Sequence, residues 1–317
     1  MKITKDMIHP QLRPVGWLIK KLKPSMGPSM FRLSNRFLDL LGAGHSFSCK
    51  VNYCQKYITR PDGSRLRLCI YSPKTPSSKK PAPGLLWIHG GGYALGIPEQ
   101  DISFIEGFVT KNGCVVVSPD YTRSTDAPYP AALNDCYNAL LWMYRNSNKL
   151  GIDPNKLAIG GDSAGGGLTA FLVLLNRDKA HIPLKLQMPL YPMIDYRHTS
   201  TSADNDAPVW NTKSNDAAWK MYLDKAYASG KVSKYASPAL ETDYHDLPPT
   251  ITYVGNIEPF YDETLTYIEQ LKSAGVPVYS RVFDGCFHGF DITVPGSAPA
   301  KEARAFLHDR FQRIMEN

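Results

Sequence analysis

Residues 157–175 constrain the fold of this chain more than any other stretch. They open with a short apolar run, Leu157–Gly160, pass through Ser163 between two glycines, and end in a second apolar run, Leu168–Leu175. This pattern predicts a buried strand, a sharp turn and a helix. The flanking glycines permit strained backbone angles and let strand and helix approach closely. We therefore expect Ser163 at the bend, with its hydroxyl presented above a sheet.

The predicted turn also has a chemical use. A helix that begins directly after Ser163 places free backbone N–H groups and its positive dipole end beside that side chain. Such groups stabilise the oxyanion that forms when a serine attacks a carbonyl carbon. A phosphate-binding turn is the alternative, but the chain lacks the Lys-Ser/Thr of a P-loop and the glycine spacing of a dinucleotide-binding motif. Ser163 is therefore a candidate nucleophile whose assignment depends on its partners.

Composition excludes several classes of protein. Hydrophobic residues make up 43% of the 317, enough for a large core in one or two domains. The net charge of +7 is modest, and the basic residues form no long run beyond Lys20–Lys23, so we expect no nucleic-acid partner. The six cysteines lack C-x-x-C spacing, which predicts free thiols, no metal site and a cytoplasmic location. The apolar run at 15–19 is too short for a signal peptide or a membrane span.

Residues 1–48 predict a helical segment with apolar faces. Two interpretations compete, namely a cap packed over a site and a basic helix lying on a membrane surface. We favour the cap because the helix around Trp17 is short, and we do not expect a membrane partner. The apolar residues that recur at helical spacing are Val15, Leu18, Ile19 and Leu22, followed by Met30, Phe31, Leu33, Phe37, Leu38 and Leu41.

From residue 50 the pattern changes to strands. Residues 51–58 and 65–71 predict an antiparallel hairpin, and strands then alternate with helices. Such alternation predicts a parallel sheet built from right-handed crossovers, with ligands bound beyond the carboxyl ends of its strands. The further expected strands are 84–88, 114–118, 157–160 and 184–190, and the expected helices are 101–112 and 130–146.

Three consecutive glycines, Gly90–Gly92, directly follow the strand at 84–88. Fixing three glycines in one conformation costs much conformational entropy, so a loop that contains them needs a reason to lack side chains. We interpret it as a loop whose backbone N–H groups face a bound atom, as in an oxyanion hole. A flexible turn is the alternative, and the missing polar linker residues make it the weaker interpretation. We expect His89 to brace this loop through a backbone hydrogen bond rather than to act as a base.

Between residues 195 and 237 the alternation stops. A polar stretch and a helix around 217–223 predict an insertion that forms a cap together with the N-terminal segment. The expected organisation is an N-terminal cap segment at 1–48, a first core part at 49–194, a cap insertion at 195–237 and a second core part at 238–317. The insertion contains four large residues that either line a substrate pocket or form the core of the cap, and we favour the core of the cap. These residues are Trp210, Trp219, Met221 and Tyr222.

Two last strands are expected at 250–254 and 278–283, with a helix at 262–274 between them. The loop after the first strand carries Glu258, and the loop after the second carries His288. A carboxylate and a histidine therefore leave the sheet at the same edge as Ser163. Serine, acid and histidine in this chain order, each directly after a strand, is typical of α/β-hydrolases.

Four motifs closely resemble the hormone-sensitive-lipase-like carboxylesterases of the α/β-hydrolase fold. The resemblance covers residues 50–317 and implies an α/β fold with a mostly parallel central sheet, flanking helices and a helical cap. The implied function is that of a serine carboxylesterase acting on short-to-medium acyl esters. Alternatives are a carbohydrate acetyl esterase or a membrane-associated lipase using the same site, and a non-catalytic small-molecule receptor. The motifs are His89–Gly92, Gly161–Gly166, Tyr191–Asp195 and His288–Phe290.

The resemblance also implies roles for individual residues. Ser163 would be the nucleophile and His288 the base, with an oxyanion hole formed by the N–H groups of Gly91, Gly92 and Ala164. The family's acid loop usually begins Asp-Pro, whereas this chain has Glu258–Pro259. Glu258 aligns with the catalytic acid, and Asp262 is the reserve candidate, interpreted as the N-cap of the next helix. The resemblance implies a small ester as substrate and no cofactor. Because members of this family often form pairs, it also makes a homodimer possible.

Overall fold

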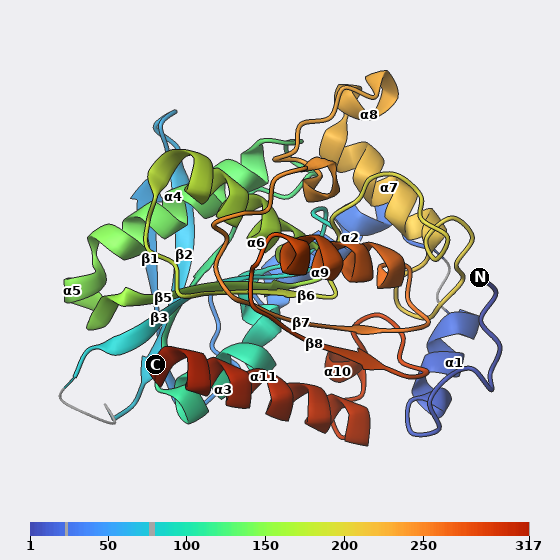
Figure 1. Cartoon of the computed structure of the whole chain (residues 1–317), viewed down its shortest axis with the longest axis horizontal. Coiled ribbons are helices and arrows are strands. Elements are labelled where there is room, and N and C mark those ends of the chain that lie inside the picture. The colour runs from blue at the N-terminus through green and yellow to red at the C-terminus, as the bar shows by residue number, and fades with distance from the viewer. Residues whose placement is uncertain (23–24, 76–79, 317) are drawn as a thin grey trace.

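The computed structural model describes residues 1–22, 25–75 and 80–316, so Lys23 of the basic segment lies outside the described residues. An eight-stranded sheet crosses the molecule in the order β1-β2-β4-β3-β5-β6-β7-β8 (Figure 1). β1 pairs antiparallel with β2 and β2 with β4, and all other pairs are parallel. The predicted α/β fold is confirmed. The strands are β1 Val51–Thr59, β2 Arg65–Pro73, β3 Ala82–Ile88, β4 Val115–Pro119, β5 Ile152–Asp162, β6 Leu186–Leu190, β7 Thr250–Gly255 and β8 Val278–Phe283.

Helices cover both faces of this sheet (Figure 1). One apolar core lies between the sheet and α4, α6 and α9, and a second lies between the sheet and α3 and α11. Because residues 115–117 of β4, the second half of β3 and residues 157–160 of β5 are buried on both faces, they are continuous runs of apolar residues and glycine in the sequence. The helices are α1 Arg13–Leu22, α2 Pro28–Leu41, α3 Ile102–Asn112, α4 Ala131–Arg145, α5 Ser147–Leu150, α6 Ala164–Leu175, α7 Thr212–Leu223, α8 Lys225–Ser229, α9 Tyr261–Ser273, α10 Phe290–Thr293 and α11 Ala298–Glu316.

The two segments expected to form a cap lie against each other. α2 packs on α7, the N–H of Met26 donates to Ser214 Oγ at 2.8 Å, and the rings of Phe31 and Trp210 lie 6.2 Å apart. Residues 195–237 contain α7 and α8 and contribute no strand to the sheet. These contacts support the division into core and cap segments, which we keep as a proposal.

The apolar residues of α2 do not all face the protein. Phe31 is fully buried, while Met30, Leu33 and Phe37 face solvent. The opposite, buried face of the helix carries the polar Asn35. Periodicity shows which side chains share a face of a helix, and it does not show which face meets the protein.

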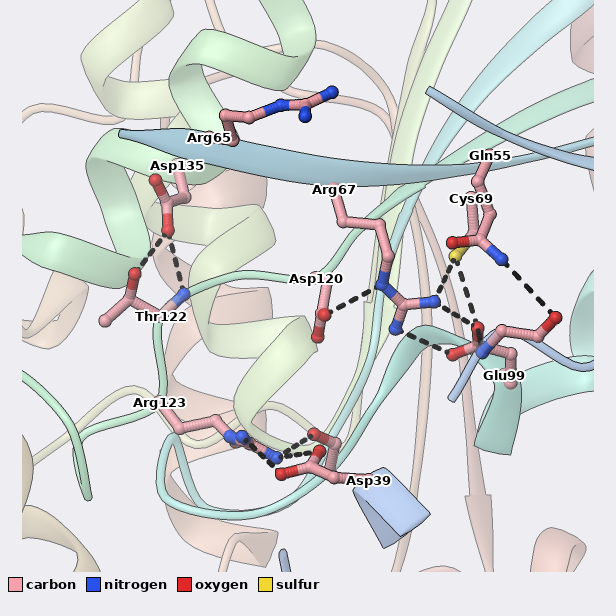
Figure 2. A network of polar contacts seen from close by, with 12 residues as sticks. Asp39, Gln55, Arg65, Arg67, Cys69, Glu99, Asp120, Thr122, Arg123 and Asp135 are labelled. Carbon is pink, nitrogen blue, oxygen red and sulfur yellow. Dashed lines mark hydrogen bonds and ion pairs between the residues drawn. The ribbon is translucent and has the colours of Figure 1, made fainter. Parts of the chain in front are cut away.

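Arg67 is a buried arginine that binds two carboxylates from different parts of the core. Arg67 on β2 forms an ion pair with both oxygens of Glu99, and its Nε donates to Asp120 at 3.0 Å (Figure 2). Glu99 also accepts from the N–H of Gly44 at 2.8 Å. Burial alone would raise the pKa of Glu99, but the hydrogen bonds from Arg67 and from Gly44 hold it below its ordinary value. The carboxylate therefore stays charged and links β2 to the segment after α2.

A second ion pair ties α2 itself to the core. The guanidinium of Arg123 donates to both oxygens of Asp39 on α2, at 2.9 and 3.0 Å (Figure 2). The same guanidinium reaches the carbonyl of Gly96 at 3.4 Å. The C-terminal half of α2 is thereby held against the loop that follows β3.

The helix after the acid loop begins one residue earlier than expected. α9 starts at Tyr261 with Phe260 at the N-cap position, so the interpretation of Asp262 as N-cap is wrong. Glu263, in the first turn, is buried and accepts from the N–H groups of Ile194 and Asp195 at 2.7 and 3.3 Å. Its other oxygen has no hydrogen-bond partner among the residues that the structure describes. Burial raises the pKa of Glu263 well above its ordinary value.

Replacing Arg67 by methionine should destabilise the protein by about 3–5 kcal/mol, because Glu99 and Asp120 would lose the guanidinium that neutralises them in the interior. Arg65→Met is the matched control, since Arg65 lies two residues away on the same strand and is exposed, and its guanidinium stacks on the ring of Tyr57 without an ion pair to any described residue. Urea unfolding measures both variants. Equal losses of unfolding free energy in the two variants would contradict the assigned role of Arg67.

Glu263→Gln should make the protein more resistant to heat at alkaline pH. The pKa of Glu263 is higher in the folded protein than its ordinary value of 4.5. The protonated side chain therefore contributes its full stabilisation below pH 4.5, and this stabilisation is lost as the pH rises through the pKa of the folded protein. The wild type should therefore melt increasingly below the variant between about pH 5 and about pH 8. Glu269→Gln, at an exposed position of the same helix, is the control. A constant offset across this range would contradict the explanation.

Candidate active site

Ser163 lies between the end of β5 and the start of α6, at the predicted bend. Its backbone adopts φ 55° and ψ −119°, a conformation that costs energy for any residue with a side chain. A Cβ at Gly165 would lie 1.9 Å from the carbonyl oxygen of Ile88, so only glycine allows α6 to approach β3 this closely. The strained turn is thus held in place by the neighbouring strand.

The structure brings three of the predicted residues together. His288 lies in the loop after β8, and its Nε2 is 2.7 Å from Ser163 Oγ. Its Nδ1 is 2.8 Å from Oε1 of Glu258, which lies in the loop after β7. With Nδ1 protonated, the imidazole donates to the carboxylate and its Nε2 accepts from the serine hydroxyl. The carboxyl ends of three strands therefore contribute one continuous chain of hydrogen bonds.

Glu258 is fully buried, and burial raises the pKa of its carboxyl group. The charge and hydrogen bond of His288 and the N–H of Gly255, at 3.3 Å from Oε2, act in the opposite direction. The ionised form of Glu258 therefore depends on these two donors. An imidazolium at His288 would in turn be stabilised by this carboxylate, which has little contact with water.

Asp262 is not part of this arrangement. Its Oδ2 accepts from the hydroxyl of Ser200, and from the N–H of Thr201 at 3.0 Å. The reserve acid thus binds the start of the cap insertion, whereas Glu258 contacts the imidazole of His288.

Two aromatic rings that no sequence pattern had singled out for this role pack edge to face on the imidazole. Phe260 meets His288 edge to face at 4.9 Å between ring centroids, and Tyr191 does so at 5.0 Å. The Tyr191 hydroxyl donates to the buried Asp291 at 3.0 Å, which holds that ring in place. Tyr191 and Phe260 both lie within segments that the sequence analysis considered, but no spacing rule showed that their rings would face His288.

The glycine loop lies next to the serine turn. Gly91 and Gly92 have φ values of 118° and 60°, in the region that favours glycine. A Cβ at Gly165 would approach the carbonyl oxygen of His89 at 2.7 Å, so the start of this loop touches α6. Ala164 is the first residue of α6, and its N–H has no acceptor within the helix.

His89 braces this loop, as expected. Its Nδ1 hydrogen-bonds to the carbonyl of Gly90 at 2.8 Å, and its ring stacks on Tyr121 at 4.2 Å. Burial lowers the pKa of His89 to about 3, so the ring is neutral in the physiological range.

Asn35 of α2 also binds the glycine loop, and sequence reasoning missed it because it lies within an apolar helical pattern. Its Nδ2 donates to the carbonyl of Ala94 at 2.9 Å, and its Oδ1 accepts from the N–H of Gly96 at 3.2 Å. The inner face of α2 is therefore bonded to the loop that carries Gly91 and Gly92.

The four large residues of the insertion occupy different places. Trp210 borders the site, since its ring lies 6.5 Å from that of His288 and would clash with any Cβ at Gly92. Trp219 and Tyr222 instead pack on Tyr93, at 5.4 and 4.1 Å between ring centroids. Met221 is half-buried in the same apolar core.

Comparison with known proteins places the chain among esterases of the α/β-hydrolase fold. The sequence profile of a family described by its alpha/beta hydrolase fold matches residues 85–292. Esterase LipI of Mycobacterium tuberculosis is 31% identical over 242 residues, which cover 76% of this chain and 74% of LipI. Carboxylesterase NlhH of the same species is 32% identical over 237 residues, covering 73% of this chain and 74% of NlhH. The solved structure of a bacterial heroin esterase aligns with a TM-score of 0.89 and 31% identity, covering 99% of this chain and 100% of that one.

These matches agree with the resemblance of the sequence motifs. The profile spans the serine turn and both loops that supply Glu258 and His288. The structural alignment extends over nearly the whole chain, including the N-terminal helices. The chain therefore belongs to the α/β-hydrolase family, among its hormone-sensitive-lipase-like carboxylesterases, and is a carboxylic ester hydrolase.

Proposed function

We propose that the protein is a serine carboxylesterase that hydrolyses short-to-medium acyl esters through Ser163, His288 and Glu258. The observation that carries this proposal is the unbroken chain of hydrogen bonds from Ser163 Oγ to His288 Nε2 at 2.7 Å and from His288 Nδ1 to Glu258 Oε1 at 2.8 Å. The strained serine turn and the neighbouring glycine loop support the same reaction.

The first half of the reaction acylates the enzyme. Ser163 Oγ attacks the ester carbonyl carbon while His288 Nε2 takes the hydroxyl proton, and Glu258 stabilises the resulting imidazolium. The N–H groups of Gly91, Gly92 and Ala164 stabilise the negative charge on the tetrahedral oxygen. The intermediate collapses when the bond to the alcohol oxygen breaks and His288 returns its proton to that alcohol.

The second half repeats these steps with water. His288 takes a proton from water, the resulting oxygen attacks the acyl carbon, and collapse releases the carboxylic acid and returns the proton to Ser163. None of these steps requires a metal or a cofactor. We expect a small molecule as substrate, because the ring of Trp210 lies beside His288 with Phe31 packed against it, and Ser163 is only 6% exposed.

A carbohydrate acetyl esterase would use the same residues and remains the second candidate. The crowding by Trp210 beside Gly92 favours a short acyl group, which an acetyl ester satisfies. Initial rates with p-nitrophenyl esters from acetate to laurate, beside acetylated sugars, distinguish the two. A non-catalytic receptor has no use for the hydrogen-bonded imidazole at His288, which counts against that alternative.

Ser163→Ala should lower kcat for p-nitrophenyl acetate by roughly 10⁴–10⁶-fold, because the nucleophile is lost. The variant should keep the melting temperature of the wild type or exceed it, since the substitution leaves the fold and its core contacts in place. Turnover retained in a well-folded variant, measured after removal of contaminating esterases, would refute the proposal.

Glu258→Ala should lower kcat by roughly 10³–10⁴-fold, whereas Asp262→Ala should leave kcat within about twofold of the wild type. Glu258 holds the imidazole, and Asp262 binds only the insertion. Glu258→Asp should retain part of the activity because it restores a carboxylate with a shorter reach. If the loss fell on the Asp262 variant instead, the assignment of the acid would be wrong.

A further inference from the structure

The solvent side of α2 carries a continuous apolar stripe. Its side chains are between 45% and 78% exposed, although helices of soluble proteins usually turn such residues inward. Their spacing places them on one face of the helix, opposite Phe31 and Asn35. Exposed apolar faces of this kind mark interaction surfaces. The stripe consists of Met30, Leu33, Phe37, Leu40 and Leu41.

Two positive charges border this stripe. Arg32 and Arg36 lie one turn apart and are exposed, and neither forms an ion pair with any residue in the described ranges. The acidic residue of the helix, Asp39, is already bound to Arg123. α2 therefore presents a basic and apolar surface with no free carboxylate, on a chain whose net charge is +7.

We propose that the outer face of α2 docks on an anionic lipid surface, which reverses our expectation from the sequence that the chain has no membrane partner. The apolar stripe would enter the boundary between headgroups and acyl chains, while Arg32 and Arg36 would contact lipid phosphates. In the described ranges no helix has both the length and the apolar composition that crossing a bilayer requires, so the contact would be peripheral. A second copy of the chain fits less well, because a two-fold contact would bring the same arginines of both copies to one interface.

The docked helix would lie next to the active site. Asn35, on its inner face, is bonded to Ala94 and Gly96 in the loop that follows Gly91 and Gly92. Esters dissolved in the bilayer would thus be concentrated close to Ser163. This inference goes beyond the proposed function and does not depend on it, since lipid binding requires none of the catalytic residues.

Co-sedimentation of the full chain with vesicles tests the proposal. Vesicles of phosphatidylcholine with about 30% phosphatidylglycerol should bind the protein at low salt, and pure phosphatidylcholine should bind it much more weakly. Raising NaCl from about 0.05 to about 0.5 M should weaken binding by roughly tenfold or more. No binding to the anionic vesicles at low salt would overturn the proposal.

Two double variants locate the contact. Arg32→Glu with Arg36→Glu should lower partitioning to anionic vesicles by roughly 30-fold or more, and Phe37→Ser with Leu40→Ser by at least about tenfold. Arg145→Glu with Lys149→Glu is the control, because it makes the same charge change at α4 and α5, the latter near the left edge of Figure 1. Equal losses in the control pair would overturn the assignment to α2.

Two further sets of measurements distinguish lipid docking from a loss of folding and from self-association of the chain. All three double variants should keep the melting temperature and the esterase turnover of the wild type, since none replaces a buried or catalytic residue. Sedimentation velocity reports whether the wild type forms a dimer. A dimer that dissociates in Phe37→Ser with Leu40→Ser, without vesicle binding by the wild type, would assign the face to a second copy and refute lipid docking.

Discussion

The hydrogen bond between Ser163 Oγ and His288 Nε2 depends on the whole sheet, because the two residues are 125 positions apart in the chain. Parallel pairing from β5 through β8 brings the loops after β5, β7 and β8 to one edge. The strained turn at Ser163 is held by backbone hydrogen bonds of its N–H to Leu190 and of its carbonyl to Met193. The cost of that conformation is offset by the packing of α6 against β3.

The second constraint is the burial of charge at this edge. Glu258 lies away from solvent, and its ionised form is supported by His288 and by the N–H of Gly255 at the end of β7. Aromatic rings cover the remaining sides of the imidazole. Water is largely excluded from the site, so the electrostatic stabilisation of an imidazolium by the carboxylate is stronger than it would be at the surface. The N-terminal helix α2 belongs to this arrangement through Asn35, although it comes from a segment outside the core.

The sequence predicted the sheet, and it predicted that Ser163, Glu258 and His288 would meet at one edge, because both features leave local signals. Buried parallel strands are continuous apolar runs, and the serine turn and the glycine loop need glycines at particular places. The choice of Glu258 over Asp262 also agreed with the geometry. The orientation of side chains could not be predicted, as the rings of Tyr191 and Phe260 and the amide of Asn35 show. Nor could periodicity reveal that the apolar stripe of α2 faces solvent, because that depends on the tertiary contacts of the opposite face.

The central claim is that Ser163 is a nucleophile activated by His288. A fluorophosphonate probe tests it most directly, since it forms a stable covalent bond only with an activated serine. After reaction, peptide mass spectrometry of the whole chain should show one adduct per molecule, located on Ser163. An adduct on another residue, or none under conditions that label a known serine esterase, would contradict the account.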